Sequence, residues 1–157
     1  MRMSVHSRLP SAVIDDRLAA SAQRPARVLV LFEPTPSGVA ALRDAAAVVD
    51  GELTVVTLAP QSLPPRCCAR GPGVEVVNCV IREDAASELH EAREILGNGT
   101  HATFRTLVGT HDPPPDVWAA EQAFDLIVLP ARRLAFGGHP LARRLRRATA
   151  AEIRVVG

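Results

Sequence analysis

The sequence predicts a single α/β domain with a five-stranded parallel sheet, and two observations lead to this fold class. Residues 126–129 (LIVL) form a continuous apolar run between Asp125 and Pro130, which is typical of a strand covered by helices on both faces. Residues 27–32 (RVLVLF) form a similar run. Strand-like segments also alternate with segments of helical periodicity, and this order predicts parallel strands joined by right-handed crossovers.

The composition is that of one globular domain. The 157 residues are 47% hydrophobic and 22% charged, and the net charge of +1 gives no overall bias toward nucleic acid or a membrane surface. No apolar segment reaches the roughly 20 residues of a membrane helix, and the first residues lack the apolar region of a signal peptide. We therefore expect a cytoplasmic protein that binds neither nucleic acid nor membrane. Three cysteines without a secretory signal argue against a disulfide framework.

The first half of the chain reads as an extension followed by strand, helix and strand. Residues 1–25 are predicted to be an N-terminal extension, and residues 26–157 the α/β domain. After the strand at 27–32, Thr35 can cap a helix that has Pro36 at its first position and ends at Gly51. Residues 52–59 (ELTVVTLA) are the next strand, and the segment 60–73 is rich in proline and reads as a loop.

The segment 74–81 is ambiguous, because its β-branched residues suit a strand and its spacing suits a helix. We predict a helix that ends at residues 97–99 (GNG). An apolar stripe at helical spacing supports it: Val77, Ile81, Ala85, Leu89, Ala92 and Leu96.

The last part of the chain repeats the alternation of strand and helix. Residues 101–108 alternate as a strand, and Asp116 can cap a helix over 117–124. The strand at 126–129 follows, then a helix over 140–150 and a strand over 152–156. The two most apolar strands should lie together at the centre, which gives the strand order 3-2-1-4-5.

Five pieces of the sequence, in order, carry a family resemblance. They are residues 35–37 (TPS) beside the first strand, 52–56 (ELTVV), 109–113 (GTHDP), 125–129 (DLIVL), and 145–148 (LRRA) leading into 153–156. Over residues 27–157 the chain thereby resembles the universal stress protein family. The resemblance implies a flavodoxin-like, Rossmann-like (HUP-type) sheet in a protein that is commonly dimeric. The resemblance leaves open whether the chain binds ATP, because one branch of the family binds ATP and another does not.

Two loops distinguish the branches. In the ATP-binding branch an Asp-Gly-Ser/Thr turn follows the first strand. The fourth strand is followed by a Gly-x-x-Gly pattern and, after a spacer of nine residues, by Gly-Ser/Thr. This chain has Glu33-Pro34-Thr35 in the first turn, and in the second loop it has residues 130–133 (PARR), then Gly138-His139 after a shortened spacer. Pro130 lacks an amide donor, and Arg133 has a long side chain where backbone must approach phosphate closely. These departures predict weak or absent ATP binding and no required cofactor.

The competing interpretation is that Arg132 and Arg133 donate to an anion in place of the glycines, so that ATP or AMP binds. The alternative to both is a solvated basic loop. The residues that the resemblance marks as nucleotide contacts are Glu33, Thr35, Leu58, Pro130, Arg132, Arg133, Gly137, Gly138 and His139. His139 can instead cap the helix that begins at Pro140.

Other polar residues suggest chemistry less specifically. Cys67, Cys68 and Cys79 could meet as a redox or metal cluster, but their spacing matches no standard zinc pattern. The alternative is two free loop thiols and a buried Cys79. His111 and Asp112 could include a general base, although a turn is the simpler interpretation. We predict no catalytic residues and no metal site.

The leading functional hypothesis is a non-enzymatic, stress-associated regulatory module that binds an unknown protein partner. The alternatives are a nucleotide-binding protein with slow or no ATP hydrolysis, using Glu33, Thr35, Gly137 and Gly138, and a cysteine-based redox sensor. A homodimer is expected through the last strand, because Ile153 and Val155 are apolar residues on a predicted edge. The resemblance implies the same interface.

Overall fold

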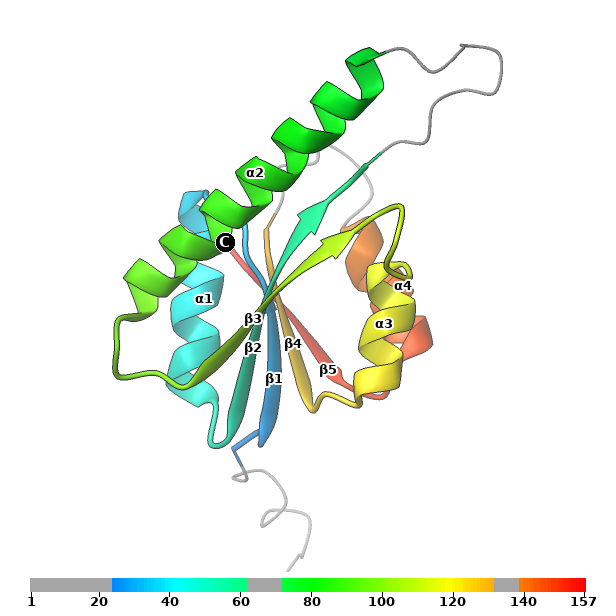
Figure 1. The fold of residues 1–157 in the computed structure, drawn as a ribbon. Helices are drawn as coiled ribbons and strands as arrows, with labels where there is room; N and C mark the ends of the chain where they lie inside the picture. The colour runs from blue at the N-terminus through cyan, green and yellow to red at the C-terminus, as the bar shows by residue number, and fades with distance from the viewer. Residues whose placement is uncertain (1–23, 62–71, 132–138) are drawn as a thin grey trace, which may run out of the picture.

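The computed structural model describes residues 24–61, 72–131 and 139–157, and within them the chain alternates strand and helix throughout (Figure 1). The elements are β1 (Arg27–Leu31), α1 (Pro36–Val48), β2 (Glu52–Ala59), α2 (Pro72–Leu96), β3 (Ala102–Val108), α3 (Pro115–Gln122), β4 (Leu126–Pro130), α4 (Pro140–Ala148) and β5 (Glu152–Val156). Every strand pair is parallel, and the order is β3-β2-β1-β4-β5. The predicted fold class and strand order are confirmed.

The sheet separates two apolar cores. Figure 1 shows α1 and α2 over one face and α3 and α4 over the other. Val28 and Val30 of β1 belong to the first core with Leu42 of α1, whereas Leu29 and Leu31 belong to the second core, which includes Trp118 of α3 and Leu145 of α4. Both sides of β1 and β4 are thus buried, which explains their continuous apolar runs.

The turn from β1 into α1 follows the prediction. Thr35 is the N-cap, its Oγ1 accepts a hydrogen bond from the Gly38 amide at 3.0 Å, and Pro36 is the first helical residue. A Cβ on Gly38 would lie 1.9 Å from the carbonyl oxygen of Glu33, so the turn needs glycine there. The helix itself ends at Val48, before the predicted stop at Gly51.

The helical interpretation of residues 74–81 is confirmed, because α2 runs from Pro72 to Leu96 and is followed by Gly97 at φ +67°. Ala85, Leu89 and Ala92 are buried as the stripe predicts. Val77 is 56% exposed, so the predicted stripe is wrong at that end. Figure 1 gives the reason: the N-terminal part of α2 projects past the sheet and has no strand beneath it.

Asp116 does not cap α3, which begins at Pro115 with Pro114 as its N-cap. The Asp116 carboxylate instead pairs with Arg144 of α4.

Asp125 joins the starts of the two central strands. Its Oδ2 accepts hydrogen bonds from the amides of Ala26 and Arg27 at 3.0 and 2.9 Å, which ties the start of β4 to the start of β1. Within the described ranges, no helix combines the length and apolar character needed to cross a membrane.

Candidate functional site

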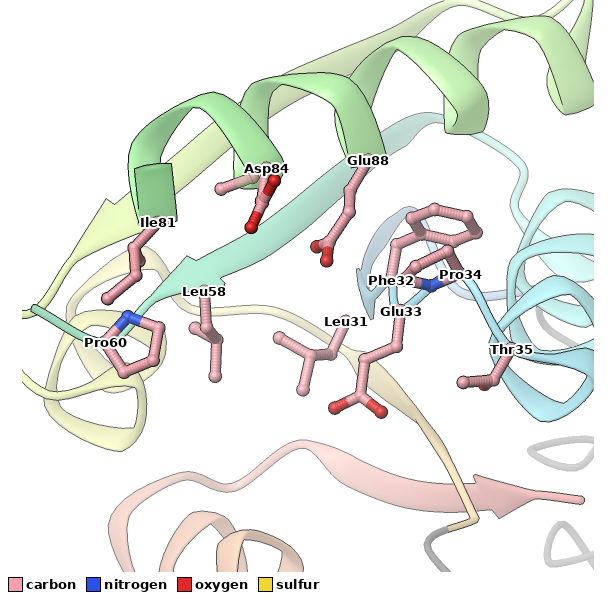
Figure 2. A pocket seen from close by; sticks show the side chains of 11 residues that line it. Leu31, Phe32, Glu33, Pro34, Thr35, Leu58, Pro60, Ile81, Asp84 and Glu88 are labelled. Carbon is pink, nitrogen blue, oxygen red and sulfur yellow. The ribbon is translucent and has the colours of Figure 1, made fainter. Parts of the chain in front are cut away.

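A cavity of about 530 Å³ opens beyond the carboxyl ends of β1 and β2, beneath α2 (Figure 2). Ligands of open parallel sheets bind at these strand ends, which makes this cavity the candidate site. Its walls come from the β1–α1 turn, the end of β2 and the middle of α2. The lining residues are Leu31, Phe32, Glu33, Pro34, Thr35, Leu58, Pro60, Ile81, Asp84, Ala85 and Glu88.

Three carboxylates line this cavity. Glu33 follows β1, while Asp84 and Glu88 are four residues apart on α2 and therefore share one face of the helix. Figure 2 shows both helix side chains extending from α2 toward the strand ends. Among the described residues that line the cavity, none is basic.

The pKa of one of these carboxyls, Glu88, responds to its surroundings. Burial raises the pKa of the Glu88 carboxyl above its ordinary value, and the charges of Glu33 and Asp84 raise that pKa further. The α2 side of the cavity thus carries two carboxylates, Asp84 and Glu88, and a further negative group placed beside them would be disfavoured. Sequence reasoning missed Asp84 and Glu88, although their spacing from Ile81 by three and seven residues was a usable signal.

A second cavity of about 200 Å³ adjoins the first at the ends of β2 and β3, and the two share Leu58 and Pro60. Asp112 lines it and accepts hydrogen bonds from the Val108 amide at 2.8 Å and from Arg105 at 3.0 Å. Both hydrogen bonds lower the pKa of Asp112, and the one from the Val108 amide has the larger effect. Asp112 therefore closes the turn after β3, as the simpler interpretation of the His111-Asp112 pair predicts.

Five of the nine predicted nucleotide contacts are among the described residues, and three of these five line the first cavity. Glu33, Thr35 and Leu58 line the first cavity. Pro130 is the buried last residue of β4, and the next carbonyl, that of Ala131, accepts a hydrogen bond from Ser37 Oγ at 3.0 Å. This bond fixes the end of β4 against the start of α1.

Of the remaining predicted contacts, the structure describes His139. His139 caps α4, because its Nδ1 accepts a hydrogen bond from the Ala142 amide at 3.3 Å. Its predicted capping role is therefore confirmed. Arg132, Arg133, Gly137 and Gly138 lie outside the described residues.

The predicted burial of Cys79 is wrong. Cys79 is exposed on α2, and its thiol donates to a Glu83 carboxylate oxygen at 3.5 Å. Cys79 lies one helical turn before Glu83, on a face of α2 that is exposed to solvent. Cys67 and Cys68 lie outside the described residues, and within the described part of the chain no group of histidine, cysteine and carboxylate side chains is arranged to hold a metal ion.

The last strand has the predicted position. β5 is at an edge of the sheet, with Ile153 partly buried against the α3 and α4 core and Val155 40% exposed. Arg154, between them, pairs with Asp44 of α1 at 3.1 Å and with Glu152 at 3.2 Å.

The fold is that of known universal stress proteins. The structure of UspA from Lactobacillus plantarum aligns with a TM-score of 0.66 at 16% identity, over 86% of this chain and 99% of that one. A universal stress protein from Archaeoglobus fulgidus aligns with a TM-score of 0.59 at 19% identity, over 91% and 100%. One in complex with cAMP gives 0.54 at 18% identity, over 86% and 99%. No family model and no curated protein matches the sequence. The fold implied by the resemblance is confirmed.

Proposed function

We propose that this chain, which carries the fold of the universal stress proteins, is a cytoplasmic, non-enzymatic regulatory module that binds a protein partner and binds ATP weakly or not at all. The observation that supports this proposal is the cavity at the strand ends, where α2 contributes the carboxylates of Asp84 and Glu88 to the lining. Two like unit charges about 5 Å apart near a protein surface repel by roughly 3 kcal/mol. A phosphate seated that close to one of these carboxylates would lose roughly a hundredfold or more in affinity.

The sequence of the second loop supports the same proposal. Pro130 has no amide to offer a phosphate, and in the sequence Arg133 takes the position of the second glycine in the pattern of the ATP-binding branch. Backbone amides in a glycine loop are already in position, whereas long side chains lose conformational entropy when they bind. We expect the loop to be a weaker phosphate site than the one it replaces.

Titration calorimetry with ATP, AMP and inorganic phosphate tests this proposal. We expect flat titrations at millimolar ligand. A dissociation constant of about 10 µM or tighter, equivalent to about 7 kcal/mol, would contradict it. The Asp84→Asn, Glu88→Gln double variant is the matched comparison, because it should bind ATP more tightly than the parent if cavity charge sets the affinity.

Nucleotide binding is the second candidate function. One protein of this fold is known in complex with cAMP, which favours keeping this candidate. It would use Glu33 and Thr35 at the cavity together with Gly137 and Gly138, and Arg132 and Arg133 are the alternative donors. Nucleotide released from the purified, denatured protein, identified by mass spectrometry, would support this candidate. Loss of calorimetric ATP binding on Arg133→Ala would assign the contact to the arginine.

We also propose a homodimer through β5. Its outer edge is open in the described sheet, and Val155 presents an apolar side chain there that is 40% exposed. Sedimentation of the parent should show a dimer at micromolar concentration, and Val155→Asp should dissociate it. A parent protein that sediments only as a monomer would refute the dimer.

A further inference from the structure

The N-terminal part of α2 carries apolar side chains that the fold does not bury. Val76, Val77 and Val80 are 60%, 56% and 48% exposed. Val117 and Val155, the other large apolar side chains exposed in the described ranges, lie singly on α3 and β5. The three valines are instead clustered within five positions of one helix, on the part of α2 that projects past the sheet (Figure 1). A clustered apolar surface of this kind marks an interaction site more often than scattered residues do.

The apolar surface leads into the acidic cavity. Val77 and Ile81 are one helical turn apart, and Ile81 lines the cavity together with Asp84 and Glu88. Residues separated by three or four positions lie on one helix face. We call Val76, Val77, Val80 and Ile81 the apolar α2 face. It and the two carboxylates form one continuous strip along the helix.

We propose that the apolar α2 face and the adjoining cavity bind a peptide segment of a partner protein that is both apolar and basic. The inference rests on the proposed partner-binding function and specifies the partner's chemistry. Apolar side chains of the segment cover the valines, and an arginine or lysine enters the cavity beside Asp84 and Glu88. A cation there would stabilise the ionised form of Glu88, which burial and then the neighbouring negative charges disfavour.

Charge complementarity selects this occupant over a second copy of the chain. A twofold-symmetric contact places a patch against the same patch, so the copy would bring its own Asp84 and Glu88 toward this acidic strip. A purely apolar segment would cover the carboxylates without a counter-charge, which is costly. A segment that is both apolar and basic complements the exposed valines and the two carboxylates.

Fluorescence anisotropy with synthetic peptides tests the proposal. The probe is a labelled peptide of leucine and lysine at amphipathic helical spacing. One comparison peptide has glutamate in place of each lysine, and the other has serine in place of each leucine. We expect the leucine and lysine peptide alone to bind, and to bind more weakly as salt is added.

Variants locate the contact. Val77→Ser and Glu88→Gln should each weaken binding of the probe about tenfold, the loss expected for one covered apolar side chain or one ion pair in a half-buried site. Glu94→Gln is the matched control, because it removes the same charge from an exposed position on α2 beyond the cavity and should leave binding unchanged. Circular dichroism of each variant verifies that the fold is retained.

Several outcomes would overturn the inference. They are equal binding of all three peptides, no binding of the probe at about 100 µM, or equal affinity of Glu88→Gln and Glu94→Gln. A dimer dissociated by Val77→Ser would assign the surface to a second copy. Probe binding that requires removal of residues 1–23 would assign it to the chain's own N-terminal segment. Absent probe binding with flat ATP titrations refutes this inference alone, whereas tight ATP binding refutes the proposed function.

Discussion

Gly38→Ala should destabilise the protein by about 3 kcal/mol. The added Cβ would lie 1.9 Å from the Glu33 carbonyl oxygen, so the backbone on one side of the turn must move by more than an ångström. That carbonyl also accepts a hydrogen bond from the Thr35 amide at 2.7 Å. Overpacking costs roughly 1–3 kcal/mol and more where backbone must shift, and a helix-propensity gain of at most about 1 kcal/mol offsets part of it.

Gly73→Ala is the matched control. Gly73 is also near the start of a helix, but a Cβ there meets nothing within 4 Å. The same substitution should therefore leave stability unchanged or raise it by up to about 1 kcal/mol. The pair isolates the steric contact from the general effect of replacing glycine.

Thermal and urea unfolding measure both variants. For a chain of this size, about 3 kcal/mol corresponds to a fall in Tm of roughly 6–12 °C. Equal midpoints for Gly38→Ala and the parent would refute the reasoning, because they would mean that the turn relaxes at no cost. A loss of the same size for Gly73→Ala would refute it too.

Three further substitutions have expected outcomes. The pKa of Glu88 is raised in the folded state, so the ionised carboxylate opposes folding above that pKa. Glu88→Gln should therefore raise Tm at neutral pH. The gain should vanish in acid well below the ordinary pKa of 4.5, because the carboxyl is then protonated in both the folded and the unfolded state. The pKa of Asp112 is lowered, so its stabilisation is present above the ordinary value of 3.8 and is lost as pH falls through the folded-state pKa. Asp112→Asn should therefore cost about 1 kcal/mol in urea unfolding at neutral pH and little in strong acid, and an equal cost at both pH values would contradict the assignment. Thr35→Ala removes the α1 cap and should cost about 1 kcal/mol in the same assay; no change in the urea midpoint would show that the cap contributes nothing.

The centre of the fold could be predicted because its signals are local. β1 and β4 are buried on both faces, and that condition appears in the sequence as an uninterrupted apolar run. Thr35 and His139 were identifiable as caps because a cap bonds to an amide within three residues of itself. Such features need no knowledge of distant segments.

The features that could not be predicted depend on where distant segments lie. Val77 and Ala85 both belong to the apolar stripe of α2, but Ala85 is buried where its carbonyl accepts a hydrogen bond from Thr57 of β2, and Val77 is 56% exposed. Asp116 fits a cap by sequence, yet Arg144, 28 residues away, pairs with its side chain. The acidic cavity joins Glu33 to Glu88 across more than 50 positions, and periodicity within one helix does not report such a meeting.

The N-terminal part of α2, which projects past the sheet, can change in sequence with little effect on the free energy of folding. Val76, Val77 and Val80 contribute little burial to the folded chain, so replacing them changes its stability little. The central strands β1 and β4 have no such freedom, because their residues 28–31 and 126–129 fill the two cores. Substitutions at the three valine positions can therefore change the chemistry of the exposed α2 surface while the fold that carries it stays unchanged.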